Sequence, residues 1–264
     1  MKPVLMKYIA LPVDAHAASQ SSMGLTGGVR RLSFYLAMEE YVARNVLGAP
    51  DSPAQAGGLD DCFFMWQVAP SVIFGRNQVM LNEVNVDYCR ENGIEMYRRK
   101  SGGGCVYADE GNVMLSFVTK ETNVGFAFNR FINMVLLVLR KVGIEGTGTV
   151  HNDVMIGNRK VCGTACYHVG DRSIVHSTLL YDTNMQHITH AITPSAAKLQ
   201  AKGIESVRQR ITLLKDYVSL SLDELKNIIR QTLCDGELLL TMQDVEGIEQ
   251  IEKEYLDRMF IQRM

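Results

Sequence analysis

The sequence predicts a mixed α+β domain built around a largely antiparallel sheet. Two tight turns, Gly157-Asn158 and Gly170-Asp171, each separate two runs of strand-forming residues, which is the pattern of β-hairpins. The run from Phe126 to Val142 repeats apolar residues at helical spacing and predicts an amphipathic helix. Hairpins followed by helices favour an antiparallel sheet over βαβ units. With 264 residues, 47% of them hydrophobic, the chain can bury the core of one large domain or two small ones.

In the N-terminal half, breakers and capping residues divide the chain into short elements. The segment from Asp14 to Gly28 is rich in Ala, Ser and Gly and is predicted to be a loop. Ser33 can cap the helix that follows it. Adjacent side chains of a helix point about 100° apart, so the pair Glu39-Glu40 is expected on a solvated face and not as a catalytic dyad. The predicted strands are 6–11, 62–68, 71–74 and 94–98, and the predicted helices are 34–47 and 86–92.

The C-terminal half holds the predicted hairpins and most of the predicted helices. The turn signal Asp109-Glu110-Gly111-Asn112 is expected to join the two strands of a first hairpin. A charged helical segment is expected to close the chain. The predicted strands are 105–108, 113–119, 154–156, 159–168 and 172–181, and the predicted helices are 126–142, 185–191 and 222–234.

Composition excludes several broad classes of protein. The net charge of −2 gives no overall signature of nucleic-acid binding, and no apolar run has the roughly 18 residues that a membrane span needs. Lys7 interrupts the apolar run at the N-terminus, which argues against a signal peptide. Six cysteines without metal-ligand spacing are typical of free thiols in a reduced compartment. We therefore predict a cytoplasmic protein that binds neither membrane nor nucleic acid.

The segment RRKSGGGCVYADEGN, from Arg98 to Asn112, is the first candidate site. Three successive glycines leave backbone N–H groups uncovered, and such groups can converge on an anion. Arg98, Arg99 and Lys100 add positive charge beside them, and arginine binds phosphate in a bidentate manner. The segment thus predicts a site for a nucleotide or another phosphate ester, against the alternative of a flexible loop beside a solvated basic face. Neither a Walker loop nor a GxGxxG motif is present.

A second candidate site surrounds the turn at Gly157-Asn158. Asp153 lies before that turn and can hold magnesium, which prefers a carboxylate together with phosphate oxygens. Lys160 lies after it and begins a strand whose Gly163 and Ala165 have little bulk. A cation beside such a groove suits a carboxylate carried on an apolar tail, although an ordinary surface lysine remains the alternative. His176, in the run IVHSTLLY, is expected to be a hydrogen-bonded core histidine rather than a catalytic one.

These segments together resemble the lipoate–protein ligase family. That family carries an RRxSGGGxVxxDxGN segment, an Asn-Asp pair, a lysine in an RK(V/I)SGxA strand, an HxTLL strand and a KGIxSVRxRxTxL segment, in this order. The matching residues here are Arg98 to Asn112, Asn152-Asp153, Arg159 to Ala165, His176 to Leu180 and Lys202 to Leu214. The turn at Gly75-Arg76 and the helix that contains Leu36 to Glu40 also fit the family.

The resemblance implies a catalytic domain like those of biotin ligases and class II aminoacyl-tRNA synthetases. It implies a two-step reaction in which ATP, with Mg²⁺, activates lipoate to lipoyl-AMP. A lysine of an apo lipoyl domain, from a 2-oxoacid dehydrogenase or the glycine cleavage H protein, then takes the acyl group. The implied catalytic residue is Lys160 and the implied metal ligand is Asp153. The implied nucleotide-binding residues are Arg99, Ser101, Gly102, Gly103, Gly104, Cys105, Val106, Tyr107, Asn152, Asp153 and Lys160, and the implied lipoate-binding residues are Arg76, Gly103, Lys160, Gly163 and His176.

The sequence departs from the family pattern after Leu214, where the remaining residues suffice for two helices. We therefore expect a catalytic domain over 1–217 and a helical tail over 218–264, without the family's accessory domain and with a possible need for a separate accessory protein. One alternative activity is transfer from lipoyl-AMP, and another is transfer from octanoyl-carrier protein through a cysteine thioester. Cys162 is two residues from Lys160 and so shares its strand face, but a packing role is favoured for it. A non-catalytic lipoyl binder is a third alternative, against which Lys160 and Asn152-Asp153 argue.

Overall fold

The computed structural model describes residues 6–12, 30–47, 59–193 and 210–262. It contains an eight-stranded sheet in the order β11-β1-β2-β6-β10-β9-β8-β7 and a three-stranded sheet in the order β4-β3-β5. From β2 to β7, in the order β2-β6-β10-β9-β8-β7, each strand is antiparallel to the next, whereas β1 is parallel to both β2 and β11. The prediction of a mixed α+β fold with a largely antiparallel sheet is therefore confirmed. The strands of the large sheet are β1 (Met6–Ala10), β2 (Asp61–Trp66), β6 (Asn112–Thr119), β7 (Thr147–Gly148), β8 (Asp153–Ile156), β9 (Arg159–Val169), β10 (Arg172–Leu180) and β11 (Cys234–Leu239).

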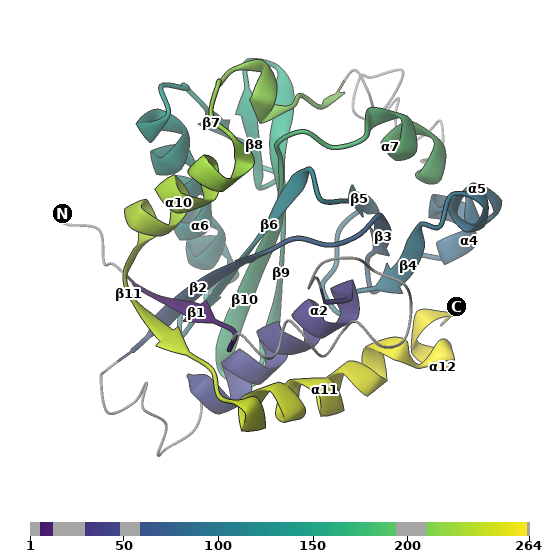
Figure 1. Ribbon diagram of the computed structural model, residues 1–264, viewed down its shortest axis with the longest axis horizontal. Coiled ribbons are helices and arrows are strands. Elements are labelled where there is room, and N and C mark those ends of the chain that lie inside the picture. The colour runs from purple at the N-terminus through teal and green to yellow at the C-terminus, as the bar shows by residue number, and fades with distance from the viewer. Residues whose placement is uncertain (1–5, 13–29, 48–58, 194–209, 263–264) are drawn as a thin grey trace.

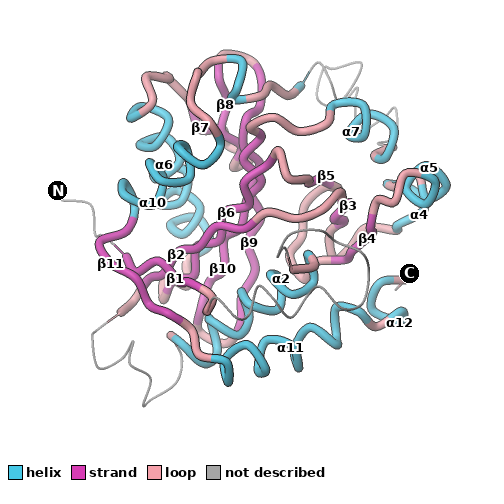
Figure 2. Tube along the Cα trace, viewed as in Figure 1, coloured by secondary structure: helices cyan, strands magenta, loops and turns pink. Residues whose placement is uncertain are grey.

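Helices cover both faces of the large sheet (Figure 1). On one face lie α6 (Val124–Lys141) and α10 (Leu222–Leu233), and on the other lie α2 (Leu32–Tyr41) and α11 (Met242–Leu256). The alternation of β2 explains the two layers, because successive strand residues point to opposite faces. Cys62 and Phe64 join the core under α2, while Phe63 between them joins the core under α6. Figure 2 shows the same arrangement, with the sheet between its two sets of helices.

The small sheet holds the first candidate site. It consists of β3 (Ser71–Phe74), β4 (Glu95–Arg98) and β5 (Val106–Ala108), and it lies beside α4 (Met80–Glu83), α5 (Val86–Glu91) and α7 (Met185–Ala191) (Figure 1). Since β4 and β5 both pair with β3, the segment between them leaves and re-enters the same sheet. The glycine run is therefore held at both ends.

The prediction of a hairpin over 105–119 is wrong, because β5 belongs to the small sheet and β6 to the large one. The turn between them packs against the end of β10. Asp182 N–H donates to the carbonyl of Gly111 at 2.8 Å, and a side chain at Gly111 would lie 2.2 Å from the Asp182 carbonyl oxygen. The Asp109 carboxylate accepts hydrogen bonds from the N–H groups of Gly111 and Asn184. These tertiary contacts separate two strands that the turn signal alone would have paired.

The predicted helical tail over 218–264 also contains a strand. Residues of β11 pair in parallel with β1, although Asp235 and Gly236 interrupt their apolar pattern. α11 and the short helix α12 (Arg258–Ile261) follow, so this part of the chain packs against α2 and β4. The other predicted elements are present within a few residues of their expected bounds, apart from Asp14 to Gly28, which lies outside the described residues.

The expectations for the helix over 34–47 require two corrections. The α-helix begins at Leu32 and continues as a π-helix (Val42–Val46), and Ser33 is buried in its first turn, where it donates to Glu252 and not to the helix N-terminus. Glu39 and Glu40 are not solvated, since their exposed fractions are 0% and 1%. The helix is apolar on nearly all sides because it lies between the sheet and α11. Glu39 accordingly contacts Ser116 and His176 of the sheet, whereas Glu40 contacts Tyr255 of α11.

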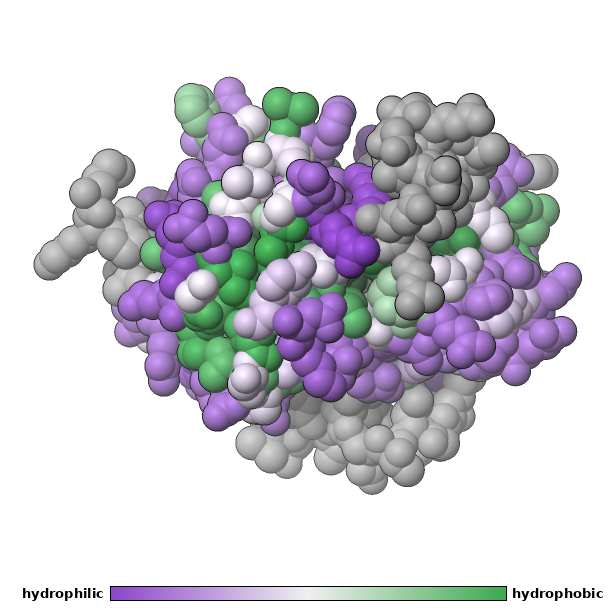
Figure 3. All heavy atoms as spheres, turned by 90° about the horizontal axis from the view of Figure 1, so that it is seen from above, coloured by the Kyte–Doolittle hydropathy of each residue, from purple (hydrophilic) through white to green (hydrophobic). Residues whose placement is uncertain are grey.

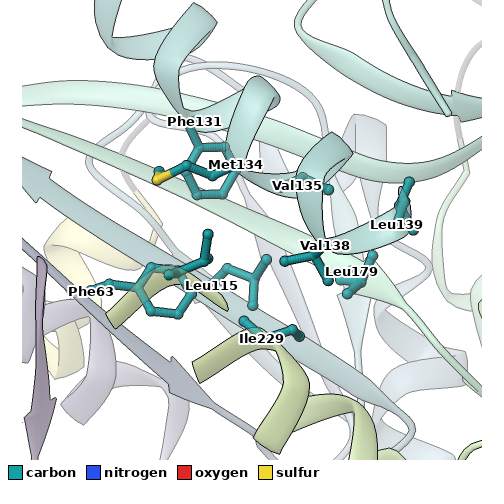
Figure 4. A pocket seen from close by; sticks show the side chains of 10 residues that line it. Phe63, Leu115, Phe131, Met134, Val135, Val138, Leu139, Leu179 and Ile229 are labelled. Carbon is teal, nitrogen blue, oxygen red and sulfur yellow. The ribbon is translucent and has the colours of Figure 1, made fainter. Parts of the chain in front are cut away.

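A small cavity lies under α6 and α10 (Figure 4). Its volume is about 10 Å³, and its lining, which includes Phe63, Leu115 and Phe131, is entirely apolar. A space of this size is a packing gap and not a ligand site. Figure 3 shows the molecule from above, turned by 90° from Figure 1. On this face a group of hydrophobic residues lies at the surface and is bordered by hydrophilic residues. Among the described residues, no helix is both long and apolar enough to cross a membrane.

Candidate active site

The Asp153 carboxylate lies between two cations, Lys160 and Arg210, and holds the Lys160 side chain in place. Nζ of Lys160 lies 2.6 Å from Oδ1 of Asp153, and Nη2 of Arg210 lies 2.7 Å from Oδ2 of the same carboxylate. Asp153 begins β8 and pairs with Gly163 on β9, which places it next to the start of β9 where Lys160 lies. Asp153 is buried, whereas the Lys160 side chain remains 20% exposed. The ammonium group is therefore fixed in direction and still open to a ligand.

Asn152 forms the turn that delivers Asp153 to this position. Its φ of 60° lies in the left-handed region, which asparagine adopts more readily than most residues. The Thr164 hydroxyl donates to the Asn152 carbonyl oxygen at 2.5 Å and ties the turn to β9. The structure thus supports a positioning role for the Asn152 backbone and records no contact of its side chain with Lys160.

The absence of a side chain at Gly163 leaves room for the Lys160 ammonium. A Cβ atom at this position would lie 2.4 Å from Nζ and 2.5 Å from Cε of Lys160. Such distances are far inside van der Waals contact, so the lysine would have to move. Since only the end of a flexible side chain has to move, the strand itself would be little disturbed.

We expect Gly163→Ala to lower the ligase activity that the sequence predicts by about 100-fold, with almost no change in stability. The displaced Lys160 would lose its position over Gly163, and a small misplacement of a catalytic group costs about this much. The measurement is the rate of adenylate formation together with the melting temperature.

Gly236→Ala is a matched control for this substitution. A Cβ atom there would lie 2.6 Å from Nζ of Lys7, a half-exposed lysine of β1 that pairs with Asp235. The same steric event would therefore occur away from the candidate site, and full activity is expected. Equal activity of Gly163→Ala and the unaltered protein would show that the position of Lys160 is unimportant.

Arg99 shapes the glycine run from inside the protein. Its exposed fraction is 5%, and its guanidinium donates to the carbonyl oxygens of Ile73, Gly102 and Gly104 at 3.0, 2.6 and 2.7 Å. A trans peptide group points its N–H opposite to its C=O. The carbonyl of Gly102 faces Arg99, so the N–H of Gly103 points away from it. Burial lowers the pKa of Arg99 to about 10, which leaves it charged at neutral pH.

The backbone of the glycine run remains open for a ligand. Gly103 and Gly104 are exposed, and Gly103 adopts a φ of 90°. Within the described part of the chain, the N–H groups of Gly102, Gly103 and Gly104 donate no hydrogen bond. The backbone that the sequence predicts to bind an anion is thus uncovered, and Arg99 supports it from behind and does not face outward.

Arg98 and Lys100 also contact protein groups. Arg98 donates to the carbonyl oxygens of Arg76, Gln78, Phe260 and Ile261 and is 1% exposed. Lys100 lies 2.7 Å from the Glu40 carboxylate and 2.8 Å from that of Glu254. The three cations that the sequence places beside the glycines therefore join the loop to the turn before it and to α11 and α12.

The turn at Gly75-Arg76 lies against the glycine run. Arg76 N–H donates to the Ser101 carbonyl oxygen at 2.9 Å, and a Cβ atom at Gly75 would lie 2.5 Å from the Gly103 carbonyl oxygen. The Arg76 side chain is exposed and lines a polar cleft of about 390 Å³ that also includes Tyr167 of β9. This volume is in the range of ligand pockets.

One face of β9 connects the glycine run with Lys160. Gly163, Ala165 and Tyr167 alternate along the strand and share that face. A Cβ atom at Gly103 would lie 3.9 Å from Cβ of Ala165, so the glycine run approaches the strand there. The structure therefore brings the two predicted sites together beside the small residues Gly163 and Ala165.

The remaining predicted residues contribute in different ways. Cys105 and Val106 are half-buried, and Tyr107 is buried in the core beside α7, so only its backbone can meet a ligand. His176 is 6% exposed, and both ring nitrogens have partners, as expected of a core histidine. Two residues were missed by the sequence reasoning. Arg210 lies in a recognised motif but was given no role, and Glu39 was assigned to a solvated face although its helix is apolar on nearly all sides.

The predicted magnesium site has one carboxylate. No group of three potential ligands is present among the described residues, and Asp153 already contacts two cations. Mg²⁺ is often bound through one or two protein carboxylates plus substrate phosphates. Asp153 therefore fits a magnesium ion that a nucleotide brings with it, and it does not form an all-protein site.

Comparison with known proteins identifies the family. The family model described as the lipoyl protein ligase A/B catalytic domain matches residues 32–234. Lipoate–protein ligase 1 of Staphylococcus aureus is 34% identical over 227 residues, and lipoate–protein ligase LplJ of Bacillus subtilis is 33% identical over 229. Both alignments cover 83% of this chain, which spans 66% of the length of each relative. The chain therefore belongs to the lipoyl protein ligase A/B family.

Solved structures show the same fold. The bipartite lipoate protein ligase of Thermoplasma acidophilum, described with its E2 lipoyl domain, has a TM-score of 0.76 at 23% identity, over 98% of this chain and 96% of the other. A lipoate–protein ligase A bound with ATP has a TM-score of 0.74 at 23% identity, over 99% of each chain. At this level of identity the likeness concerns the fold alone.

Proposed function

We propose that the chain is a lipoate–protein ligase that activates lipoate with ATP to lipoyl-AMP and transfers the lipoyl group to a lysine of an apo lipoyl domain. The observation that carries this proposal is the position of Lys160. Its ammonium is fixed by Asp153 above the side-chain-free Gly163, on the strand face that the open glycine run approaches. The family relation and the names of the relatives support the same activity.

In the activation step, Lys160 brings two anions together. The lipoate carboxylate must approach the α-phosphate, and a cation between them offsets their repulsion and stabilises charge that develops at phosphorus. The N–H groups of the glycine run would hold the nucleotide, with Arg99 and Ser101 fixing the loop from behind. Asp153 would be the protein ligand of a magnesium ion, which would supply positive charge to offset that of the leaving pyrophosphate.

The lipoate tail would lie along β9. Gly163 and Ala165 would leave a groove over the strand for it, and Tyr167 of the same strand face also lines the cleft beside Arg76. The ring of His176 would line this groove without donating to the ligand, since its nitrogens already have partners. In the transfer step Lys160 would polarise the acyl carbonyl toward attack by the lysine of the lipoyl domain.

The wider biological setting is part of the same proposal. The acceptors would be lipoyl domains of 2-oxoacid dehydrogenases or the glycine cleavage H protein, and a separate accessory protein would assist activation if the chain needs one. None of the six cysteines, all of which the structure describes, forms a disulfide, which supports a reducing, cytoplasmic setting. The assignment of catalysis to residues 1–217 stays a prediction.

Mass spectrometry of an apo lipoyl domain tests the proposal. The purified chain is incubated with the domain, lipoate, ATP and magnesium, and parallel reactions contain lipoyl-AMP or octanoyl-carrier protein instead. Modification that requires both ATP and lipoate is the expected result. Modification from lipoyl-AMP alone would place activation in a partner, and modification from octanoyl-carrier protein alone would contradict the ligase assignment.

The cysteine thioester alternative finds little support in the structure. Cys162 is fully buried, and burial raises its pKa to about 11, which disfavours the thiolate needed for attack. Burial likewise raises the pKa of Cys166 to about 11. Both thiols near Lys160 therefore favour the protonated form, which is a poor nucleophile.

A further inference from the structure

Three buried side chains form a hydrogen-bonded row behind the glycine run. Glu39 Oε2 of α2 lies 2.8 Å from His176 Nδ1 of β10, and His176 Nε2 lies 2.7 Å from the Ser101 hydroxyl oxygen. The exposed fractions of Glu39, His176 and Ser101 are 0%, 6% and 0%. The proposed reaction above uses none of the three as a group that touches the reacting atoms.

The donor and acceptor capacity of each group determines which atom donates in each hydrogen bond of the row. The Glu39 carboxylate can only accept, so Nδ1 of His176 carries the hydrogen. In the neutral ring Nε2 is then an acceptor, and it accepts from the Ser101 hydroxyl. The Ser101 oxygen in turn accepts from Nε of Arg99 at 2.9 Å. Every donor and acceptor in the row is satisfied with this one tautomer of His176.

A fourth contact fixes Glu39 from the sheet. The Ser116 hydroxyl donates to Glu39 Oε1 at 2.6 Å and itself accepts from Nε1 of Trp66 at 2.8 Å. The carboxylate therefore has a donor on each oxygen and cannot turn away from His176. The row begins at a rigid point of the core and ends at the loop.

Ser101, His176 and Glu39 follow the order of a Ser–His–acid triad, but the Ser101 hydroxyl does not serve as a nucleophile. Ser101 is entirely buried, so no substrate atom reaches its hydroxyl oxygen. Its neighbours are instead the two parts of the ligand site. Its carbonyl accepts from Arg76 N–H, and Arg99 joins it to the carbonyls of Gly102 and Gly104.

We propose that Glu39 is a positioning residue that fixes the Nδ1–H tautomer of His176 and, through Ser101, the shape of the glycine run. Glu39 lies on α2, which packs against both the large sheet and the small sheet, so it ties the loop to the core rather than to the ligand. The identity of the ligand that the loop binds, ATP, rests on the proposed function. The tautomer and the loop conformation do not.

The test is Glu39→Gln, which keeps the size of the side chain. The amide oxygen would still accept from Ser116, so its nitrogen would donate to Nδ1 and move the hydrogen of His176 to Nε2. Nε2–H and Arg99 would then both donate to Ser101, whose own hydroxyl hydrogen would lose its acceptor. ¹⁵N NMR of the histidine rings is expected to show the changed tautomer, and the amide resonances of Gly102, Gly103 and Gly104 are expected to shift.

The functional readout is the affinity for ATP, measured by calorimetry, together with the steady-state constants. The dissociation constant and KM for ATP are expected to rise about tenfold, with kcat changed by much less. Glu40→Gln is the matched control, because the adjacent buried carboxylate contacts Lys100 and Tyr255 instead and should leave the His176 tautomer unchanged. Ser101→Ala serves as a second variant. It should keep the tautomer and still shift the glycine resonances.

Two outcomes would overturn the proposal. One is an unchanged His176 tautomer in folded Glu39→Gln, and the other is a changed tautomer without any shift of the glycine resonances. Should Glu39→Gln fail to fold, unshifted glycine resonances in Ser101→Ala would also overturn it. An unaltered protein that binds no ATP would contradict the proposed function, and the NMR result would still decide the role of Glu39.

Discussion

Lys160→Ala is expected to lower adenylate formation by about a thousandfold while the protein stays folded. Two unit charges of like sign 4 Å apart repel by about 4 kcal/mol at an effective dielectric constant near 20, which corresponds to roughly three factors of ten in rate. In the proposed reaction, the ammonium of Lys160 offsets this repulsion. After the substitution Asp153 keeps its ion pair with Arg210, so no buried charge is left alone.

The rate of pyrophosphate release measures the activation step, and a thermal melt measures the stability. Lys120→Ala is a suitable control, since Lys120 also pairs with one carboxylate, that of Asp60. It follows the C-terminal end of β6, which lies across the sheet from the C-terminal end of β9 and thus away from Lys160. Its activity should be unaffected. If Lys160→Ala forms adenylate at a near-normal rate and is defective only in transfer, the lysine acts in the second step alone.

Arg99→Met is expected to have the largest effect on stability, about 3 kcal/mol, because it leaves several buried carbonyl groups without a donor. For a chain of this size such a loss lowers the melting temperature by roughly 6 to 12 °C. Arg99→Lys should also be destabilising. A lysine carries the charge but cannot reproduce the planar set of donors that meets Ile73, Gly102 and Gly104.

Arg90→Met provides the comparison for this effect. Arg90 is 71% exposed and pairs only loosely with Asp87 at 3.8 Å, so its loss should change the melting temperature by little. Thermal melts and ATP calorimetry of both variants separate two roles for Arg99. A normal melting temperature with a large loss of ATP affinity would mean that Arg99 meets the phosphate directly and does not support the loop.

Much of the site was predictable from local sequence. The glycine run, the Asn-Asp pair and the lysine strand are each continuous segments, and their chemistry follows from the residue types. The pairing of Asp153 with Lys160 was also within reach, because a two-residue turn brings the ends of a hairpin together. The strands and helices with clear periodicity, such as β9, β10 and α6, were predicted close to their observed bounds for the same reason.

The predictions from sequence were wrong where contacts between residues far apart in the chain determine strand pairing, side-chain direction or burial. The turn at Asp109 to Asn112 looks like a hairpin turn, but its docking on Asp182 sends β5 and β6 into different sheets. The direction of Arg99 could not be read from its position beside three glycines, because the carbonyls that it meets include Ile73 from another strand. Glu39 looked like half of a surface pair, and only the packing of α2 between the sheet and α11 shows that it is buried.

The sequence by itself determined the class of fold, the family and the segments that carry the chemistry, since these depend on residue type, spacing and order along the chain. Only the tertiary structure decided which groups face a ligand and which hold the site in place. Arg98, Arg99 and Lys100 are adjacent cations in the sequence, yet burial and nearby acceptors turn all three toward protein groups. The N–H groups of the glycine run and the Lys160 ammonium stay uncovered because Gly103 and Gly163 have no side chain.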